Sequence, residues 1–270
     1  MNEKEQSSVV SREKPEKQKQ ETQNTLTLVH EFPASRFTDK ETYKAEEKDL
    51  QEQLFHVQQA YFHQNRRALI IFEGWDASGK GGAIRRVTEK LDPRGVRVWH
   101  HVPAPGNMTI FDRSHYGRVL VERVDQLASD AQWQRGYREI NEFEETLHNS
   151  GVRIVKLFMH ISAAEQRKRF EERLRNPYKR WKLTAEDLHN SKQRHHYISA
   201  INDMFAKTNT PFAPWKIIDG EHKWQARVEV LRAIVEVLSA DVDIVPPPLD
   251  EDLIAMATEE LNITDELPGI

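Results

Sequence analysis

The sequence contains no cysteine and no long apolar run. The first absence excludes disulfides and thiolate metal sites, and it suits a reducing compartment. Residues 1–24 lack an apolar core of signal-peptide length, and no later stretch approaches the roughly 18 apolar residues that a membrane span needs. We therefore expect a cytoplasmic protein without a membrane partner.

An excess of charge of one sign is also absent, because 30% of the 270 residues are charged while the formal net charge is only -4. Any attraction for a polyanion must therefore come from a local basic patch. The length and the 38% share of hydrophobic residues allow one sizeable domain with extensions. We expect a disordered tail over residues 1–24, one domain over 25–245 and an acidic extension over 246–270.

Helical and extended patterns alternate along the chain. Runs of β-branched and aromatic residues predict strands over 68–74, 96–102, 108–114, 152–162 and 215–219. Apolar spacing and capping signals predict helices over 40–66, 81–91 and 133–149, one opened by Ser162 with Glu165 as a capping box, a long one opened by Thr184, and one over 221–239. This order predicts an α/β fold with helices on both faces of a parallel sheet.

One junction conflicts with that topology. Only residues 103–107 separate the second and third predicted strands, whereas parallel neighbours in a sheet need a crossover of roughly a dozen residues or more. Either these two strands pair as a hairpin, or a crossover is missing.

A glycine-rich stretch, FEGWDASGKGGA, covers residues 72–83. It matches the phosphate-binding pattern G-x-x-x-x-G-K-[ST] at Gly74, Gly79 and Lys80, and it lies between a strand and a helix as the pattern requires. In such a loop, backbone N–H groups and the helix N-terminus bind anionic oxygens, while the lysine reaches the transferred group. The expected phosphate-binding positions are Gly74, Ser78, Gly79, Lys80, Gly81 and Gly82. The competing interpretation is a glycine turn that only joins a strand to a helix.

The loop departs from the pattern in two places. Gly81 replaces the hydroxyl residue that normally binds magnesium, and Asp76 lies inside the loop. A magnesium ion must therefore use other oxygens, and the candidates are Asp76 and Asp112, which ends the third predicted strand. Alternatively, Asp76 orients an incoming phosphate or forms a simple loop hydrogen bond, and Asp112 caps a helix or turn.

Two further features are basic. Arg113 and Arg118 flank the segment RSHYGR, and the planar guanidinium suits phosphate oxygens, although either arginine could instead pair with a carboxylate. Residues 165–184 are rich in arginine and lysine, and Pro177 interrupts their helix. The positions expected on a lid that closes over a phosphate-bearing substrate are Lys179, Arg180 and Lys182.

Other signals are weak. The histidine pairs at 100–101 and 195–196 lack cysteine partners for a zinc site, and Ser114 next to His115 is poorly placed for a triad, whose members meet in space. Trp181, Trp215 and Trp224 are more typical of core or lid packing than of a base-stacking platform. We therefore expect no nucleic-acid partner.

Three stretches together, GWDASGKGG, FDRSHYGRVLVERV and the run from NPYKRWKLT to TPFAPWKIID, resemble the polyphosphate kinase 2 family, most closely its polyphosphate:AMP phosphotransferase type. The resemblance runs from about Leu50 to Leu238. It implies a P-loop kinase-like fold with a lid, magnesium dependence with manganese as an alternative, homo-oligomers, and phosphoryl transfer between inorganic polyphosphate and AMP or ADP. By motif, it assigns catalysis to Asp76, Lys80, Asp112 and Arg113, and lid contacts to Lys179, Arg180 and Lys182.

The chain departs from the family at the same short junction. Family members usually carry a helical segment between the VPAP stretch and the GxMxIFDRS strand, and here HVPAP runs directly into GNMTIFDRS. Three other functions compete with polyphosphate:AMP transfer: a polyphosphate:ADP phosphotransferase, an ATP-dependent kinase of a nucleotide or small metabolite, and a phosphate-binding module without activity, which the short junction favours.

Overall fold

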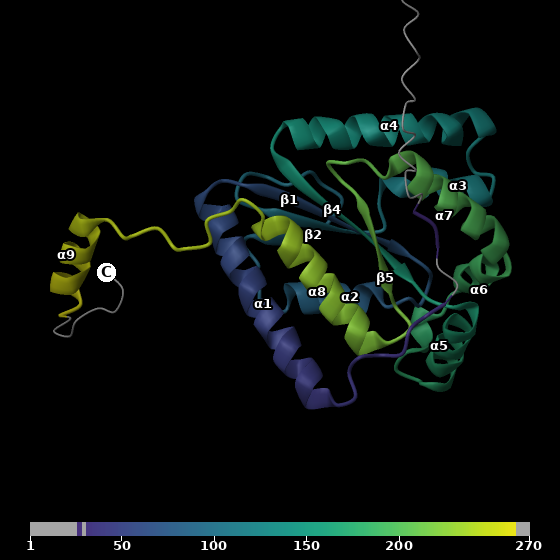
Figure 1. Cartoon of the computed structure of the whole chain (residues 1–270), viewed down its shortest axis with the longest axis horizontal. Coiled ribbons are helices and arrows are strands. Elements are labelled where there is room, and N and C mark those ends of the chain that lie inside the picture. The colour runs from purple at the N-terminus through teal and green to yellow at the C-terminus, as the bar shows by residue number, and fades with distance from the viewer. Residues whose placement is uncertain (1–25, 29–30, 263–270) are drawn as a thin grey trace, which may run out of the picture.

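The computed structural model describes residues 26–28 and 31–262. A five-stranded parallel sheet with the order β2-β3-β1-β4-β5 forms its centre (Figure 1). The strands are β1 (Arg67–Gly74), β2 (Val96–Val98), β3 (Met108–Asp112), β4 (Val152–His160) and β5 (Trp215–Asp219). The predicted tail over 1–24 lies outside the described residues.

Helices cover both faces of the sheet, which confirms the predicted fold class. On one face lie α1 (Lys40–His63), α2 (Lys80–Thr88) and α8 (Lys223–Ser239), and on the other lie η1 (His115–Val119), α3 (Val121–Val124), α4 (Asp130–Asn149) and α7 (Arg194–Thr208). The lid region comprises α5 (Ala163–Arg175), η2 (Arg180–Lys182) and α6 (Ala185–Lys192).

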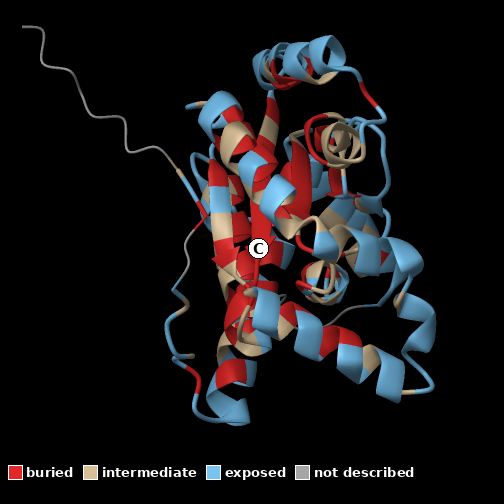
Figure 2. Ribbon diagram, turned by 90° about the vertical axis from the view of Figure 1, so that its right-hand side faces the viewer, coloured by how far each residue is buried: buried red, intermediate tan, exposed pale blue. Residues whose placement is uncertain are grey.

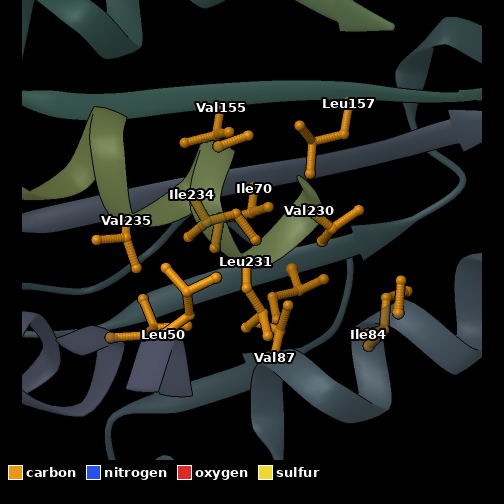
Figure 3. Close-up of a cluster of buried hydrophobic side chains, with 14 of the residues drawn as sticks. Leu50, Ile70, Ile84, Val87, Val155, Leu157, Val230, Leu231, Ile234 and Val235 are labelled. Carbon is orange, nitrogen blue, oxygen red and sulfur yellow. The ribbon is translucent and has the colours of Figure 1, made fainter. Parts of the chain in front are cut away.

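Alternation along the strands builds two separate cores. Ile70 faces α1, α2 and α8, whereas its neighbours Leu69 and Ile71 belong to the core under α4 and α7, because successive strand residues point to opposite faces. Figure 3 shows the first core, in which Leu231 and Ile234 of α8 lie against the sheet. Figure 2 shows buried residues concentrated in the sheet and on the inner sides of the helices.

Several predicted boundaries change. The long helix predicted after Thr184 is two helices, since α6 ends at Lys192 and α7 begins at Arg194, with Gln193 between them. Ser162 caps α5 as expected, and its hydroxyl accepts a hydrogen bond from the backbone N–H of Glu165. In a capping box the backbone N–H of Ser162 would donate to the Glu165 side chain. Here it donates to the Glu221 carboxylate instead, and the Glu165 carboxylate pairs with Arg169.

β2 and β3 do not form a hairpin, which was one of the two expectations for their junction. The two strands are parallel, with Val96 opposite Met108 and Val98 opposite Ile110, and residues 99–107 join them without a helix. Such a short return is feasible because β2 has three residues, so the chain must move back by only about 10 Å at roughly 3.3 Å per residue. The connection is anchored where Trp99 N–H donates to the Ile110 carbonyl at 3.1 Å and Gly106 N–H donates to the Arg66 carbonyl at 3.0 Å.

The extension beyond α8 is an arm rather than part of the domain. Residues 240–250 lead to α9 (Glu251–Glu260), which buries none of its residues and lies apart from the body in Figure 1. Within the described residues, no helix has the length and hydropathy that crossing a membrane requires.

Candidate phosphate-transfer site

The phosphate loop connects β1 to α2, and glycine is required where the chain leaves the strand. Gly74 has φ +136°, and a Cβ there would lie 2.3 Å from the carbonyl oxygen of Met159 on β4. Gly79, with φ +109°, is the N-cap of α2 and has no side chain to satisfy the first helical N–H groups. These N–H groups therefore remain suited to binding an anion.

The space beside Gly81 is open. A Cβ at Gly81 would meet no atom within 4 Å among the described residues, and one at Gly82 would come no closer than 3.9 Å to Arg227. The missing hydroxyl of the usual pattern is therefore not explained by crowding from the protein. The loop instead presents bare backbone to whatever binds there.

Lys80 is folded back on the loop itself. Its Nζ donates to the carbonyl oxygens of Gly74 at 2.7 Å and Trp75 at 3.2 Å. Burial lowers the pKa of Lys80, and the negative charges of Asp76, Glu73 and Asp112 offset part of that effect. The ammonium group is thus placed within the loop, among three carboxylates.

Asp76 joins three segments of the fold. Its Oδ1 accepts a hydrogen bond from Arg113 Nη2 at 3.0 Å, and its Oδ2 accepts one from Asn190 Nδ2 of α6 at 3.0 Å. Arg113 Nη1 also lies 3.5 Å from Glu186 Oε1, again on α6. The structure therefore brings Asp76, Lys80 and Arg113 together, and α6 approaches the same point from the lid side.

Asp112 ends β3, opposite Phe72 in register, and is exposed. Together with Asp76 it provides carboxylate oxygens at the carboxyl ends of adjacent strands. Among the described residues, no group of three or more His, Asp or Glu side chains is arranged to hold a metal. This donor set fits magnesium bound through one or two carboxylates with the remaining positions left to substrate phosphates and water.

A cavity of about 280 Å³ opens next to the loop. Asp76 and Arg113 lie on its wall with the polar residues Glu73, Ser114, Gln166 and Asn190, and apolar side chains from β4, α7 and the turn after β3 also line it. The apolar lining includes Trp75, Leu120, Val121, Phe158 and Ile201. A mostly apolar cavity with a few charged groups at one end is typical of a site for a small molecule with an apolar body and a charged end.

Other predicted residues are placed elsewhere. Arg118 pairs with Glu122 at 2.9 Å, and its side chain lies where a Cβ on Gly136 of α4 would be. On η2, Arg180 donates to the Leu174 carbonyl at 2.8 Å, and Lys182 lies 5.1 Å from the centre of the Trp181 ring. In the part of the chain that is described, no hydrogen bond joins the side chains of Arg118, Lys179, Arg180 or Lys182 to the phosphate loop.

Sequence reasoning missed Arg169, which clamps the loop from α5. This buried side chain donates to the carbonyls of Ala77 at 3.0 Å and Ser78 at 2.8 Å, and to Gly220 at 2.6 Å beyond β5. Its spacing from Gln166 and Phe170 places all three on the buried face of α5. That periodicity could have separated Arg169 from the solvated Arg167 and Lys168, which pair with Glu171 and Glu165.

A buried polar network lies behind the segment that follows Arg113. Lys156 Nζ of β4 donates to Glu144 Oε2 at 2.7 Å, to Tyr116 OH at 3.0 Å and to the Thr208 carbonyl at 2.7 Å. Glu144 also accepts from Tyr116 OH at 2.8 Å and lies 3.2 Å from His115 Nε2. The network connects η1 to α4, β4 and α7, so it supports the turn that carries Arg113.

Fold and loop together define a protein of the P-loop kinase-like class: a parallel sheet, a glycine-rich loop at its carboxyl edge, a half-buried lysine and a cavity beside them. The family model of polyphosphate kinase 2 matches residues 37–99 and 96–244, and its two parts meet at the short connection after β2. The chain belongs to this family, which confirms the resemblance found in the sequence.

Three relatives illustrate the match. A polyphosphate:AMP phosphotransferase of Acinetobacter johnsonii is 44% identical over 220 residues, which cover 74% of this chain and 46% of that protein. An ADP-polyphosphate phosphotransferase of Pseudomonas aeruginosa is 36% identical over 69% of this chain and 68% of its own length. The crystal structure of polyphosphate kinase 2 from Arthrobacter aurescens superposes with a TM-score of 0.79 at 30% identity, over 88% of this chain and 94% of that one. This chain thus spans about half the length of the polyphosphate:AMP phosphotransferases it matches.

Proposed function

We propose that this protein transfers a phosphoryl group from inorganic polyphosphate to AMP, forming ADP, in a magnesium-dependent reaction. The observation that carries the proposal is the meeting of Lys80, Asp76 and Arg113 beside the cavity, whose wall includes Asp76 and Arg113. The preference for AMP over ADP is supported by the names of three relatives that are 40–44% identical, whereas the ADP-specific relative is 36% identical.

The acceptor fits the cavity beside the loop. The apolar lining would receive the base and sugar, and Arg113 at the cavity wall would contact the phosphate. A nucleotide phosphate is already an anionic nucleophile, so little proton abstraction is needed. The task of the site is to align two anionic chains and to offset their repulsion.

The loop and its clamps supply the fixed part of that site. Backbone N–H groups at the start of α2 and the Lys80 ammonium would hold the phosphate that is transferred. Arg169 and Gln166 keep the loop in shape through its carbonyl oxygens, so the binding groups need little rearrangement. Asp76 and Asp112 would hold magnesium, whose charge neutralises phosphate oxygens when it is bound.

The exposed lid would bind the polyanionic donor. Lys179, Arg180 and Lys182 lie on and next to η2, between α5 and the helix that touches Asp76. A polyanion releases counterions when basic side chains bind it, so affinity for polyphosphate should fall steeply with salt. A cytoplasmic location, where nucleotides are available, and a homo-oligomeric state complete the proposal.

The first test is nucleotide analysis after mixing the protein with magnesium, polyphosphate and either AMP or ADP. Lys80→Ala should reduce turnover by about a hundredfold or more, whereas Lys48→Ala, on the exposed side of α1, should leave it unchanged. Full activity of Lys80→Ala would refute the proposed site. ADP as the sole acceptor, ATP as the sole donor, or binding without turnover would each replace the proposal with the corresponding competing function.

The lid is tested separately. Replacing Lys179, Arg180 and Lys182 with glutamine should raise the KM for polyphosphate, flatten its dependence on salt and leave the KM for AMP little changed. The control replaces Arg167 and Lys168, which lie on the solvated face of α5 in pairs with glutamates. Equal effects from the two sets would show that general charge, rather than the lid, attracts the donor.

A further inference from the structure

The edge of the sheet at β2 carries an uncovered apolar patch. We define the edge patch as Phe62, Val98, Trp99 and Val102, which are 63%, 49%, 62% and 50% exposed. These residues come from the end of α1, from β2 and from the connection after it. The connection passes close to α1, because a Cβ at Gly106 would lie 3.5 Å from the backbone of Phe62.

The patch is exposed because the return from β2 to β3 has no helix. Residues 99–107 run back along the sheet as an irregular segment, so the outer side of the three-residue β2 has neither a neighbouring strand nor a covering helix among the described residues. Contiguous exposed apolar surface and open sheet edges typically mark an interface.

The surroundings of the patch are basic. Residues 93–111 contain two arginines and two histidines but no aspartate or glutamate, although Arg94 pairs with the preceding Asp92 at 2.7 Å and so adds little net charge. Arg97 of β2 is exposed, and His101 stacks on Trp99 with ring centres 5.7 Å apart. A partner for this edge should therefore combine an apolar face with negative charge.

The C-terminal arm has that chemistry. In α9 the residues Leu253, Ile254, Met256 and Ala257 fall on one side at helical spacing, and Leu253 and Met256 are 51% and 63% exposed. Residues 240–262 contain seven acidic residues and no lysine or arginine. A polar-flanked apolar helix face with nothing packed on it requires a partner to be stable.

The point where the arm leaves the domain and the linker that follows it indicate where that partner lies. Gln64, two residues beyond Phe62, donates to the Asp243 carbonyl at 2.7 Å, so the arm leaves the body beside the edge patch. Pro246–Pro248 then favour a stiff, extended segment, and α9 stands away from its own domain (Figure 1). An arm that starts at the patch but is held off it can reach a second copy across a two-fold axis at this edge.

We propose that α9 of one copy of this chain docks on the edge patch of a second copy, and that the exchange is reciprocal. Leu253 and Met256 would cover Trp99 and Val102, while the acidic side of the helix faces Arg97 and the histidines. Such an interface uses the same surfaces on both subunits. It is independent of the proposed activity, because neither element belongs to the phosphate-transfer site.

The cysteine-free chain allows a direct test. Full-length Val102→Cys and Leu253→Cys proteins, one of them carrying a tag, are mixed and treated with a short bis-maleimide crosslinker. A mixed product of twice the 31.6 kDa chain mass is expected. The matched control pairs Val102→Cys with Ala255→Cys, on the opposite side of α9, and should give several times less product.

Two outcomes would overturn the exchange. A crosslink that forms only within a doubly substituted Val102→Cys/Leu253→Cys chain would mean that α9 docks on its own domain. No crosslink in either arrangement would mean that another molecule, or none, covers the patch. As a second measurement, Leu253→Glu should lower the mass found by light scattering while Ala255→Glu does not, and equal masses for the two variants would also contradict the proposal.

Discussion

Replacing Lys156 by methionine tests the buried network behind the Arg113 turn. The side chains of Lys156 and Glu144 are both 0% exposed, and Nζ lies 2.7 Å from Oε2. Methionine keeps most of the volume of the lysine but removes its charge and its three donated hydrogen bonds. Glu144 would then remain as a buried carboxylate without its cation.

The expected loss follows from that unpaired charge. Removing one partner of a buried ion pair typically costs about 3 to 5 kcal/mol of unfolding free energy. In the double variant Lys156→Met/Glu144→Leu no charge remains buried, and the loss should fall to about 1 to 3 kcal/mol because Tyr116 OH and the Thr208 carbonyl still lack partners. The double variant should therefore be more stable than the single one.

Urea unfolding followed by circular dichroism and tryptophan fluorescence measures these differences. The matched control is Lys216→Met on β5, because Lys216 also lies in a strand and pairs with a glutamate, but its side chain is 53% exposed. An exposed pair contributes about 0 to 1 kcal/mol. The reasoning fails if Lys156→Met costs no more than Lys216→Met, or if adding Glu144→Leu lowers stability further.

The network also predicts a dependence on pH. Burial opposes ionisation of Glu144, but the hydrogen bond to His115 and the charge of Lys156 outweigh it, so the pKa of Glu144 lies below its ordinary value of 4.5. A lowered pKa stabilises the fold above that value, and the contribution is lost as the pH falls through the folded-state pKa. The stability difference between wild type and Lys156→Met should therefore shrink in acid.

Two further predictions concern the end of β1 and the phosphate loop. Burial raises the pKa of Glu73 above 4.5, and Ser114 and Lys80 partly offset this effect. The protonated Glu73 therefore stabilises the fold fully below pH 4.5, and this contribution is lost as the pH rises through the folded-state pKa. Glu73→Gln should gain stability relative to wild type at neutral pH, and parallel pH profiles of the two proteins in urea unfolding would contradict this. Gly74→Ala should prevent stable folding, because its Cβ would lie 2.3 Å from Met159 O at φ +136°. Gly81→Ala should melt like wild type, because its Cβ meets open space. Similar melting temperatures for the two variants would refute the close-approach argument.

Local patterns predicted most of the fold correctly. The run ALIIFEG is apolar at five of the six positions that the sheet buries between two helical layers, Glu73 being the exception, and its final glycine is the one that the close approach to β4 requires. The loop motif and the strand ending in Asp112 then placed Lys80, Asp76 and Arg113 at one edge, because parallel strands end together. These inferences needed only periodicity and chain direction.

The sequence could not predict in the same way which charged side chains pair when they lie far apart along the chain. Arg118 and Arg113 are both arginines next to the same motif, yet one pairs within its own turn with Glu122 and the other with Asp76, 37 residues away. Asn190 carries no motif, and its contact with Asp76 depends on how the lid helices pack. Sequence spacing reports neighbours on an element, whereas these contacts are set by the tertiary fold.

The short connection after β2 is an exception to the rule that parallel neighbouring strands need a long crossover. The rule assumes strands of about five or six residues whose ends lie far apart, but β2 has three, and the nine residues 99–107 can extend to roughly 30 Å. The pairing therefore stays parallel without a crossover helix, and the consequence falls on the edge strand alone. Lys80, Asp76 and Arg113 lie at the ends of β1 and β3, which are paired on both sides, so a connection without a helix between β2 and β3 exposes an edge but leaves the loop in place.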